Sequence, residues 1–223
     1  MARLPADPEG FIRANTALGR PTMVPEFRLW LASEYVPIWQ ATEDWLDQHN
    51  VDPPYWAFCW PGGQAIARYL LDHPEVVNGK RVLDFAAGSG VSSMAAARAG
   101  ARSVVANDID LLSLVAARLN AAANGLGLQV NADDWLAHPE AAPAADVVIA
   151  GDVCYEREMS ERALAWLRGH ASAGRLVLLG DPGRNYFSAQ NLEELARYEI
   201  PTSLQLENRG MRETVVWRVL PHT

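Results

Sequence analysis

Cysteine is scarce in this chain, and long apolar runs and an excess of positive charge are absent. Only two cysteines, Cys59 and Cys154, occur among 223 residues, and they stand far apart in no ligand spacing. That excludes a disulfide scaffold and gives no support for a zinc site. No apolar stretch approaches the roughly 20 residues that a membrane-spanning helix needs. The net charge of −8 disfavours nucleic acid as a partner and suits a cationic substrate.

The N-terminus carries no export signal that can be read from its sequence. Residues 1–10 lack the apolar core of a signal peptide, and Asp7 and Glu9 argue against a transit peptide. With 49% apolar and 21% charged residues, the composition is that of an ordinary globular protein. We therefore expect a cytoplasmic protein, with a monomer favoured. An Asp-Pro-Pro break divides an N-terminal extension, residues 1–52, from a single domain, residues 53–223.

Strands and helices alternate regularly in the second half of the chain. The predicted strands are 82–85, 103–107, 128–132, 146–151 and 175–180, and the predicted helices between them are 89–98, 111–124 and 158–170. This alternation predicts a parallel sheet with helices on both faces, an α/β fold. Before it, the pattern favours helices at 9–18 and 36–49, a strand at 27–32 and a further helix from residue 61.

The C-terminal end of the predicted sheet differs from the rest. A short helix is expected at 192–197, followed by strands at 200–207 and 213–220 with only the tight turn 208–210 between them. Such strands form an antiparallel hairpin. A parallel sheet that closes on an antiparallel hairpin is the ending expected of the Rossmann-like, seven-stranded class I methyltransferase fold, whereas a dehydrogenase domain more often adds a sixth parallel strand.

A nucleotide-like cofactor is indicated by residues 81–90, which read Arg-Val-Leu-Asp-Phe-Ala-Ala-Gly-Ser-Gly. Gly88 and Gly90 let the backbone approach such a cofactor, and Asp108, at the end of the next strand, is placed to bind ribose hydroxyls. Asp84 would repel a pyrophosphate, but it suits a cofactor that carries an amine and a sulfonium cation. The pattern therefore predicts S-adenosylmethionine rather than NAD, although Asp84 could also simply cap a turn.

Acidic residues at other strand ends have two interpretations each. Asp108 could be a helix N-cap rather than a ribose ligand, and Asp110 is the better N-cap because Leu111 begins the next helix. One acid of the pair 133–134, which we assign to Asp134, is placed to accept from the adenine amino group. Trp135 either packs against the adenine ring or closes the core.

One position departs from the pattern usual for this glycine turn. A glycine commonly stands two residues after the acid, and here Ala86 occupies that place. Because alanine resists a positive φ, the position is either in an ordinary backbone region or mildly strained. Gly88 and Gly90 remain, so cofactor binding is still expected.

The chain from residue 54 to residue 190 resembles the electron transfer flavoprotein β-subunit lysine methyltransferases, which are seven-strand enzymes with an Asp-x-x-Tyr motif. A more distant likeness continues upstream through Val-Pro-Glu-Phe-Arg-Leu at 24–29. The segments that carry the resemblance are Pro-Tyr-Trp-Ala-Phe-Cys-Trp-Pro-Gly-Gly-Gln-Ala at 54–65, Gly-Lys-Arg-Val-Leu-Asp at 79–84, Ala-Asn-Asp-Ile-Asp at 106–110, Gly-Asp-Val-Cys-Tyr at 151–155 and Gly-Asp-Pro-Gly-Arg at 180–184.

The resemblance implies roles for particular residues. Trp60 is implied to lie beside the methionine end of the cofactor, and Asp152 with Tyr155 to line a channel for the substrate lysine. Asp152 follows the fourth strand, where a carboxylate could hold an ammonium, and Tyr155 could offer a ring face to a cation. Without the resemblance, an N-cap and a half-buried core aromatic are equally good interpretations. Residues 180–184 form a turn that is a candidate substrate-side loop.

The implied reaction is methyl transfer from S-adenosylmethionine to lysines of the electron transfer flavoprotein β subunit, with no metal required. A ribosomal protein is an alternative substrate, because neighbouring methyltransferases modify such proteins. A nicotinamide oxidoreductase is disfavoured by Asp84 and by the lack of a substrate domain. A non-catalytic adaptor is disfavoured because Asp108, Asp152 and Tyr155 are all present.

Overall fold

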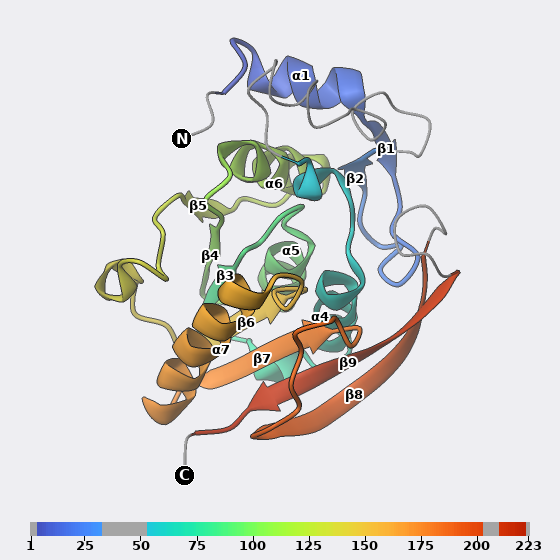
Figure 1. Cartoon of the computed structure of the whole chain (residues 1–223). Coiled ribbons are helices and arrows are strands. Elements are labelled where there is room, and N and C mark those ends of the chain that lie inside the picture. The colour runs from blue at the N-terminus through green and yellow to red at the C-terminus, as the bar shows by residue number, and fades with distance from the viewer. Residues whose placement is uncertain (1–3, 33–52, 203–209, 222–223) are drawn as a thin grey trace.

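The computed structural model describes residues 4–32, 53–202 and 210–221. Its main feature is a seven-stranded sheet in the order β5-β4-β3-β6-β7-β9-β8, which Figure 1 traces. The strands are β3 (Arg81–Phe85), β4 (Ser103–Asn107), β5 (Gln129–Asn131), β6 (Val147–Gly151), β7 (Leu176–Asp181), β8 (Leu192–Pro201) and β9 (Met211–Val219). The first five in this order are parallel, whereas β9 runs antiparallel to both β7 and β8. The predicted fold class is confirmed.

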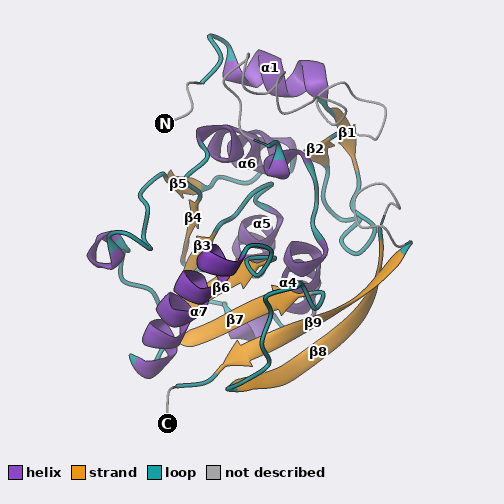
Figure 2. Cartoon of the chain, viewed as in Figure 1, coloured by secondary structure: helices purple, strands orange, loops and turns teal. Residues whose placement is uncertain are grey.

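Three helices follow strands of the sheet, as the alternation predicts: α5 (Val91–Arg98), α6 (Leu111–Ala123) and α7 (Arg157–Ser172). A fourth helix, α4 (Pro61–Asp72), precedes β3. Because β3, β6 and β7 are buried on both faces, they are nearly continuous apolar runs rather than alternating ones. Helices therefore cover both faces of the sheet, and Figure 2 separates them from the strands.

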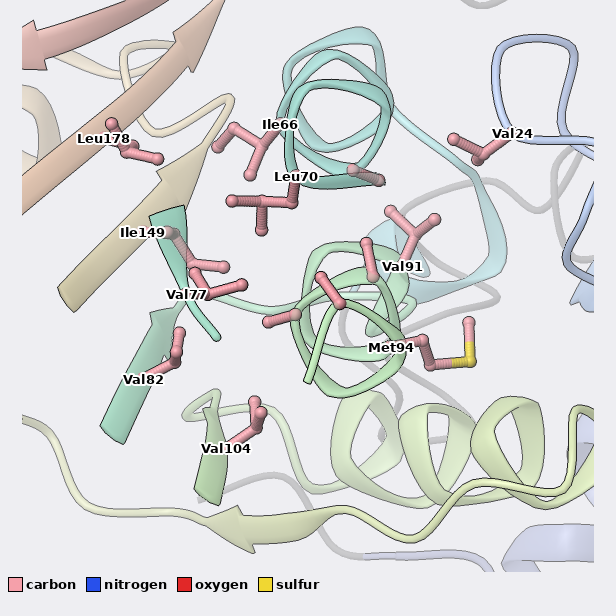
Figure 3. Packing of buried hydrophobic residues seen from close by; sticks show 14 of the residues in the cluster. Val24, Ile66, Leu70, Val77, Val82, Val91, Met94, Val104, Ile149 and Leu178 are labelled. Carbon is pink, nitrogen blue, oxygen red and sulfur yellow. The ribbon is translucent and has the colours of Figure 1, made fainter. Parts of the chain in front are cut away.

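The core is divided by the sheet into two layers. On one face, Ile66 and Leu70 of α4 and Met94 of α5 pack with Ile149 and Leu178 of the central strands, as Figure 3 shows. On the other face, side chains of α7 pack against the residues of the same strands that point the opposite way. The alternation of these two sets along each strand fixes the strand register, because a shift by one residue would exchange the faces.

The N-terminal helix is shorter than the sequence predicts. Helix α1 (Pro8–Asn15) ends before residue 18, and β1 (Ala17–Gly19) then pairs with β2 (Leu29–Leu31). The Asp7 side chain caps α1 by accepting from the Gly10 amide at 2.9 Å. Ile12 packs with α6 in a third apolar cluster, and Arg28 and Trp30 donate backbone hydrogen bonds to asparagine side chains of the α6 end. The helix expected at 36–49 lies outside the described residues.

A second prediction is wrong at the C-terminal end. Residues 192–197 are not a helix but the first part of β8, which pairs with β9 from Leu192 to Pro201 and carries an irregularity between Glu194 and Ala196. The predicted antiparallel hairpin is confirmed, with its first strand beginning earlier than expected. The turn expected at 208–210 falls outside the described residues except for Gly210.

Candidate active site

The strand order reverses at one point of the sheet. Strand β3 pairs with β4 on one side and with β6 on the other, so the chain leaves β3 for one edge and later returns to build the other. Ligands of open α/β sheets bind beyond the carboxyl ends of the strands at such a point. The loops after β3, β4, β6 and β7 therefore form the candidate site, and each of these strand ends carries an aspartate: Asp84, Asp108, Asp152 and Asp181.

The loop after β3 has an unusual backbone. Ala86, Gly88 and Gly90 all have positive φ, at 54°, 51° and 77°. The strained alternative is thus the correct one for Ala86, at a cost of roughly 1 kcal/mol. A Cβ at Gly90 would lie 2.8 Å from the Cβ of Ala117, so α6 leaves no room for a side chain there. A Cβ at Gly88 would meet nothing within 4 Å, which leaves space next to the loop.

Asp84 is buried beneath this loop, with only 2% of its surface exposed. Its Oδ2 accepts a hydrogen bond of 2.6 Å from the Ser93 hydroxyl of α5. The carboxyl group therefore ties the end of β3 to the first turn of α5 and fixes the shape of the glycine loop. Burial raises the pKa of Asp84 from 3.8 to about 7, and the nearby Asp108 adds to that increase, whereas the Ser93 hydrogen bond opposes it.

The raised pKa of Asp84 predicts how the stability of the ligand-free protein depends on pH. Between about pH 4 and about pH 7 the unfolded carboxyl is ionised while the folded one holds its proton, so unfolding releases a proton. The free energy of unfolding should therefore fall as pH rises through this window, by up to about 1.4 kcal/mol per pH unit.

Replacing Asp84 by asparagine should reduce this dependence, leaving the contribution of Asp108 and Asp181, whose pKa values are also raised. Thermal melts from about pH 5 to about pH 8 would measure the change. Asp146→Asn is the control, because the Arg81 guanidinium holds the pKa of Asp146 below its usual range and the group stays ionised throughout these pH values. A wild-type slope retained in Asp84→Asn would contradict the prediction.

Asp108 joins two loops at the end of β4. Its Oδ2 accepts from the Gly88 amide at 2.9 Å, and its Oδ1 accepts from the Asp110 amide at 3.0 Å. Each oxygen keeps a further lone pair that could accept from a hydroxyl. Burial raises the pKa of Asp108 to about 6. Asp110 is the N-cap of α6, accepting from the Leu112 amide at 2.8 Å, as the sequence predicts.

Of the two predicted site residues after β5, Asp134 is exposed and Trp135 is buried. Asp134 is exposed, and its Oδ1 accepts from the amides of Leu136 and Ala137, both at 3.0 Å, so it caps a turn. Trp135 is fully buried in the α7-side core, with its ring 6.0 Å from that of Trp166. This placement favours the core alternative for Trp135. A contact between Asp134 and adenine stays a prediction.

Asp152, directly after β6, lies at the centre of a hydrogen-bond network. Its φ is +60°, a left-handed conformation that aspartate tolerates better than most residues. Oδ2 accepts from the Gly63 amide of α4 at 3.0 Å. Oδ1 accepts from Arg184 twice, from Nη2 at 2.6 Å and from Nε at 3.1 Å. The carboxylate thus lies at the positive N-terminal end of α4 and is paired with a guanidinium.

Glycines allow α4 to approach the strand ends this closely. A Cβ at Gly62 would lie 2.7 Å from the Asp152 amide nitrogen, and one at Gly151 would lie 2.7 Å from the Gly63 amide nitrogen. The Gly180 carbonyl, at the end of β7, accepts from the Asp152 amide at 2.9 Å. Backbone therefore packs directly on backbone where α4, β6 and β7 meet.

Aromatic rings line the same end of the sheet. Trp60, the N-cap residue of α4, has its ring centroid 6.1 Å from that of Tyr55, and Tyr55 is 5.6 Å from Tyr155. The Trp60 indole nitrogen donates to the Tyr55 carbonyl at 2.8 Å. Tyr155 is 47% exposed, so its ring is accessible at the rim. Trp60 and Tyr155 are therefore linked through a third ring.

The structure brings most of the predicted site residues to one end of the sheet. Trp60, Asp152 and Tyr155 form one group, and Asp84, Gly88, Gly90 and Asp108 form the other, on either side of the β3–β6 boundary. Sequence reasoning missed Tyr55, and it assigned no role to Arg184. The Gly-Asp-Pro-Gly-Arg string was the available signal for Arg184, but a turn motif does not reveal which carboxylate its arginine binds.

The described part of the chain has neither a membrane-spanning helix nor a metal site. No helix there is long and apolar enough to span a membrane. Across residues 4–32, 53–202 and 210–221, no group of three or more His, Cys, Asp and Glu side chains is arranged to hold a metal ion.

Comparison with known proteins places this architecture. A family model described as Ribosomal protein L11 methyltransferase (PrmA) matches residues 66–153. Among solved structures, the Thermus thermophilus 16S rRNA N2 G1207 methyltransferase in complex with AdoMet and guanosine superimposes with a TM-score of 0.55. The two are 18% identical, and the match covers 74% of this chain and 44% of that one.

The sheet order, the glycine loop after β3 and the acids at the strand ends define a class I methyltransferase. The chain is 38% identical to the Xenopus laevis electron transfer flavoprotein beta subunit lysine methyltransferase, over 96% of this chain and 87% of that protein. It is 35% identical to the Homo sapiens protein of the same name, over 96% of this chain and 84% of that one. The chain belongs to the electron transfer flavoprotein beta subunit lysine methyltransferase family.

Proposed function

We propose that this protein transfers methyl groups from S-adenosylmethionine to lysine side chains of the electron transfer flavoprotein beta subunit. The observation that carries the proposal is the identity of 38% with a relative so named, which extends over 96% of the chain rather than over the glycine loop alone. Tyr155 is linked to Trp60 through the ring of Tyr55, and Asp152 is linked to Trp60 through Arg184, and these contacts support a lysine-binding role. A cytoplasmic location stays a prediction of the sequence.

The residues of the glycine loop fit S-adenosylmethionine. The space next to Gly88 is open, and the Asp108 carboxylate keeps lone pairs for the two ribose hydroxyls. The carboxyl groups of Asp84 and Asp108 make this end of the sheet suited to a cationic cofactor and unsuited to a pyrophosphate. Asp108 and the loop amides would hold the nucleoside, and Trp60 would flank the methionine end.

The cofactor supplies an electrophilic methyl group on a sulfonium sulfur. This chain's own contribution is to position the attacking amine and to keep water away from it. Trp60, Tyr55 and Tyr155 provide ring faces that a cationic or neutral lysine head can contact. Asp152 holds the start of α4, which carries Trp60, and the side chain of Arg184 in fixed places through its hydrogen bonds.

A ribosomal protein remains the second candidate substrate, because the L11 methyltransferase family model matches residues 66–153. That match covers the shared cofactor-binding part and ends before Tyr155 and before the 180–184 turn. The relatives named for the flavoprotein extend through both regions. The flavoprotein is therefore the favoured substrate.

The test is a direct transfer assay. The purified protein is incubated with S-adenosylmethionine and either electron transfer flavoprotein or ribosomal protein L11, and each product is analysed by intact mass and peptide mapping. Mass increases by whole methyl groups on lysines of the flavoprotein beta subunit are expected. Methylation of L11 without methylation of the flavoprotein would overturn the substrate assignment.

Asp108→Ala should weaken S-adenosylmethionine binding by about 10-fold or more, because two charge-assisted hydrogen bonds to ribose hydroxyls would be lost. Isothermal titration calorimetry measures the effect. Asp146→Ala, which changes an acid at the opposite end of the strands, is the control and should bind with wild-type affinity. Equal affinities for the two variants would remove Asp108 from the binding site.

A further inference from the structure

Arg184 occupies the position next to Asp152 that a substrate ammonium would otherwise take. Its guanidinium donates to Asp152 Oδ1 through both Nη2 and Nε, and the two side chains are only 15% and 11% exposed. The guanidinium carbon also lies 5.5 Å from the centre of the Trp60 ring. An arginine of the enzyme itself therefore already makes the carboxylate and ring contacts expected for a bound cation.

Burial favours the uncharged form of the described titratable groups around this pair. The Arg184 amide donates to Asp181 Oδ1 at 2.8 Å, and burial raises the pKa of Asp181 to about 7. Burial likewise raises the pKa of Cys59, and it raises the pKa of Cys154 to about 12, so both thiols stay neutral. Burial also raises the pKa of Tyr155; the charge of Asp108 adds to this increase, and the charge of Arg184 opposes it.

Charge matters here because only a neutral amine can attack the methyl group. A free carboxylate beside the lysine would stabilise its ammonium form and raise the pKa of the amine. A guanidinium bound to that carboxylate cancels this effect, since the pair carries no net charge. An isolated lysine amine has a pKa of about 10.4, so the fraction that is neutral near pH 7 is small and sensitive to such a change.

We propose that Arg184 is a positioning residue that neutralises Asp152, so that the lysine enters the pocket as a neutral amine after giving its proton to solvent. The amine lone pair then forms the new nitrogen–carbon bond as the carbon–sulfur bond breaks, and the sulfur leaves as a neutral thioether. The positive charge moves to the nitrogen, which releases its proton to solvent before another transfer. This inference rests on the proposed lysine methylation.

The test is the pH dependence of kcat for a lysine peptide, because kcat reports ionisations in the enzyme–substrate complex, where the lysine lies near Asp152. In Arg184→Met, which keeps an unbranched stem next to Trp60, the acid limb should move up by about one pH unit. Arg184→Lys keeps the charge and should keep the wild-type limb, even if its rate is lower. Arg81→Met is the matched control, because Arg81 also donates to an aspartate, Asp146, through Nε and Nη2, at the opposite end of the strands.

Two further measurements test whether the acid limb of the pH profile reports the ionisation of the substrate lysine amine. A peptide with thialysine, whose amine is less basic than that of lysine, should move the limb down in wild type and in Arg184→Met alike. The upward shift should also persist in an Asp181→Asn background, which removes the group with a pKa near neutral that lies next to Arg184. The proposal would be overturned if the acid limb stayed at the same pH with the thialysine peptide. It would also be overturned if the shift caused by Arg184→Met disappeared in the Asp181→Asn background.

An equal loss of kcat at every pH in Arg184→Met would also overturn it, since a purely structural role predicts that result. Melting temperature and S-adenosylmethionine affinity are measured for each variant. If Arg184→Met does not fold, Arg184→Gln, whose amide can still donate to Asp152, carries the same comparison. A wild-type enzyme that methylates no lysine would overturn the proposed function, whereas an active wild type with an unshifted variant overturns this inference alone.

Discussion

Replacing Asp152 by alanine is expected to reduce methyl transfer at least about 100-fold while S-adenosylmethionine still binds. The variant loses the acceptor for the Gly63 amide and the anchor for the Arg184 side chain. The start of α4, which carries Trp60, and the loop that carries Arg184 would both move. Misplacement of a reacting group by about 1 Å can cost this much in rate.

The measurement pairs a radiolabel transfer assay with calorimetric titration of S-adenosylmethionine. Asp146→Ala is the matched control, because Asp146 is also held at two points by an arginine but lies at the far end of the sheet. That variant should transfer methyl groups at the wild-type rate. Unchanged turnover in Asp152→Ala would eliminate Asp152 from the active site.

Gly62→Ala should lower the free energy of unfolding by about 1–3 kcal/mol and impair methyl transfer as well. The added Cβ would lie 2.6 Å from Asp152 Oδ2 and 2.7 Å from the Asp152 amide nitrogen. Backbone cannot yield as a flexible side chain does, so either α4 or the end of β6 must shift. Because the same residues hold Arg184, the shift would reach the pocket.

The neighbouring glycine provides the comparison. A Cβ at Gly63 would meet side chains, Val91 Cγ1 at 3.3 Å and Ser92 Oγ at 3.7 Å, which can adjust. Gly63→Ala should therefore melt close to wild type and retain its activity. Urea denaturation followed by circular dichroism gives the free energies. Equal stability losses in the two variants would mean that the close approach at Gly62 does not limit the packing.

The sequence was sufficient to predict the central sheet because its strands are buried on both faces. Strands such as β3, β6 and β7 are short apolar runs between turn signals, and their alternation with helices leaves few possible topologies. The prediction failed at residues 192–197, where Leu, Glu, Ala and Arg favour a helix. Pairing with β9 overrides that preference, and the charged residues suit an edge strand.

The site was partly predictable for a similar reason. Local patterns distinguished the N-cap Asp110 from Asp108, because capping depends on neighbours in the chain. The pairing of Arg184 with Asp152 joins residues far apart in sequence, and no spacing rule encodes it. The sequence also did not determine whether Trp135 is buried, since a tryptophan beside a strand end can turn toward a ligand or toward the core.

The left-handed backbone at Asp152 restricts which amino acids can replace it. With a φ of +60°, this position favours glycine, asparagine and aspartate over most other residues. Within that group aspartate alone has a carboxylate. Glutamate, the usual conservative exchange, would combine an unfavourable backbone with a side chain one methylene too long for Gly63 and Arg184. In a saturation library, position 152 would therefore be selected both for tolerance of a left-handed backbone and for a carboxylate, and aspartate meets both requirements.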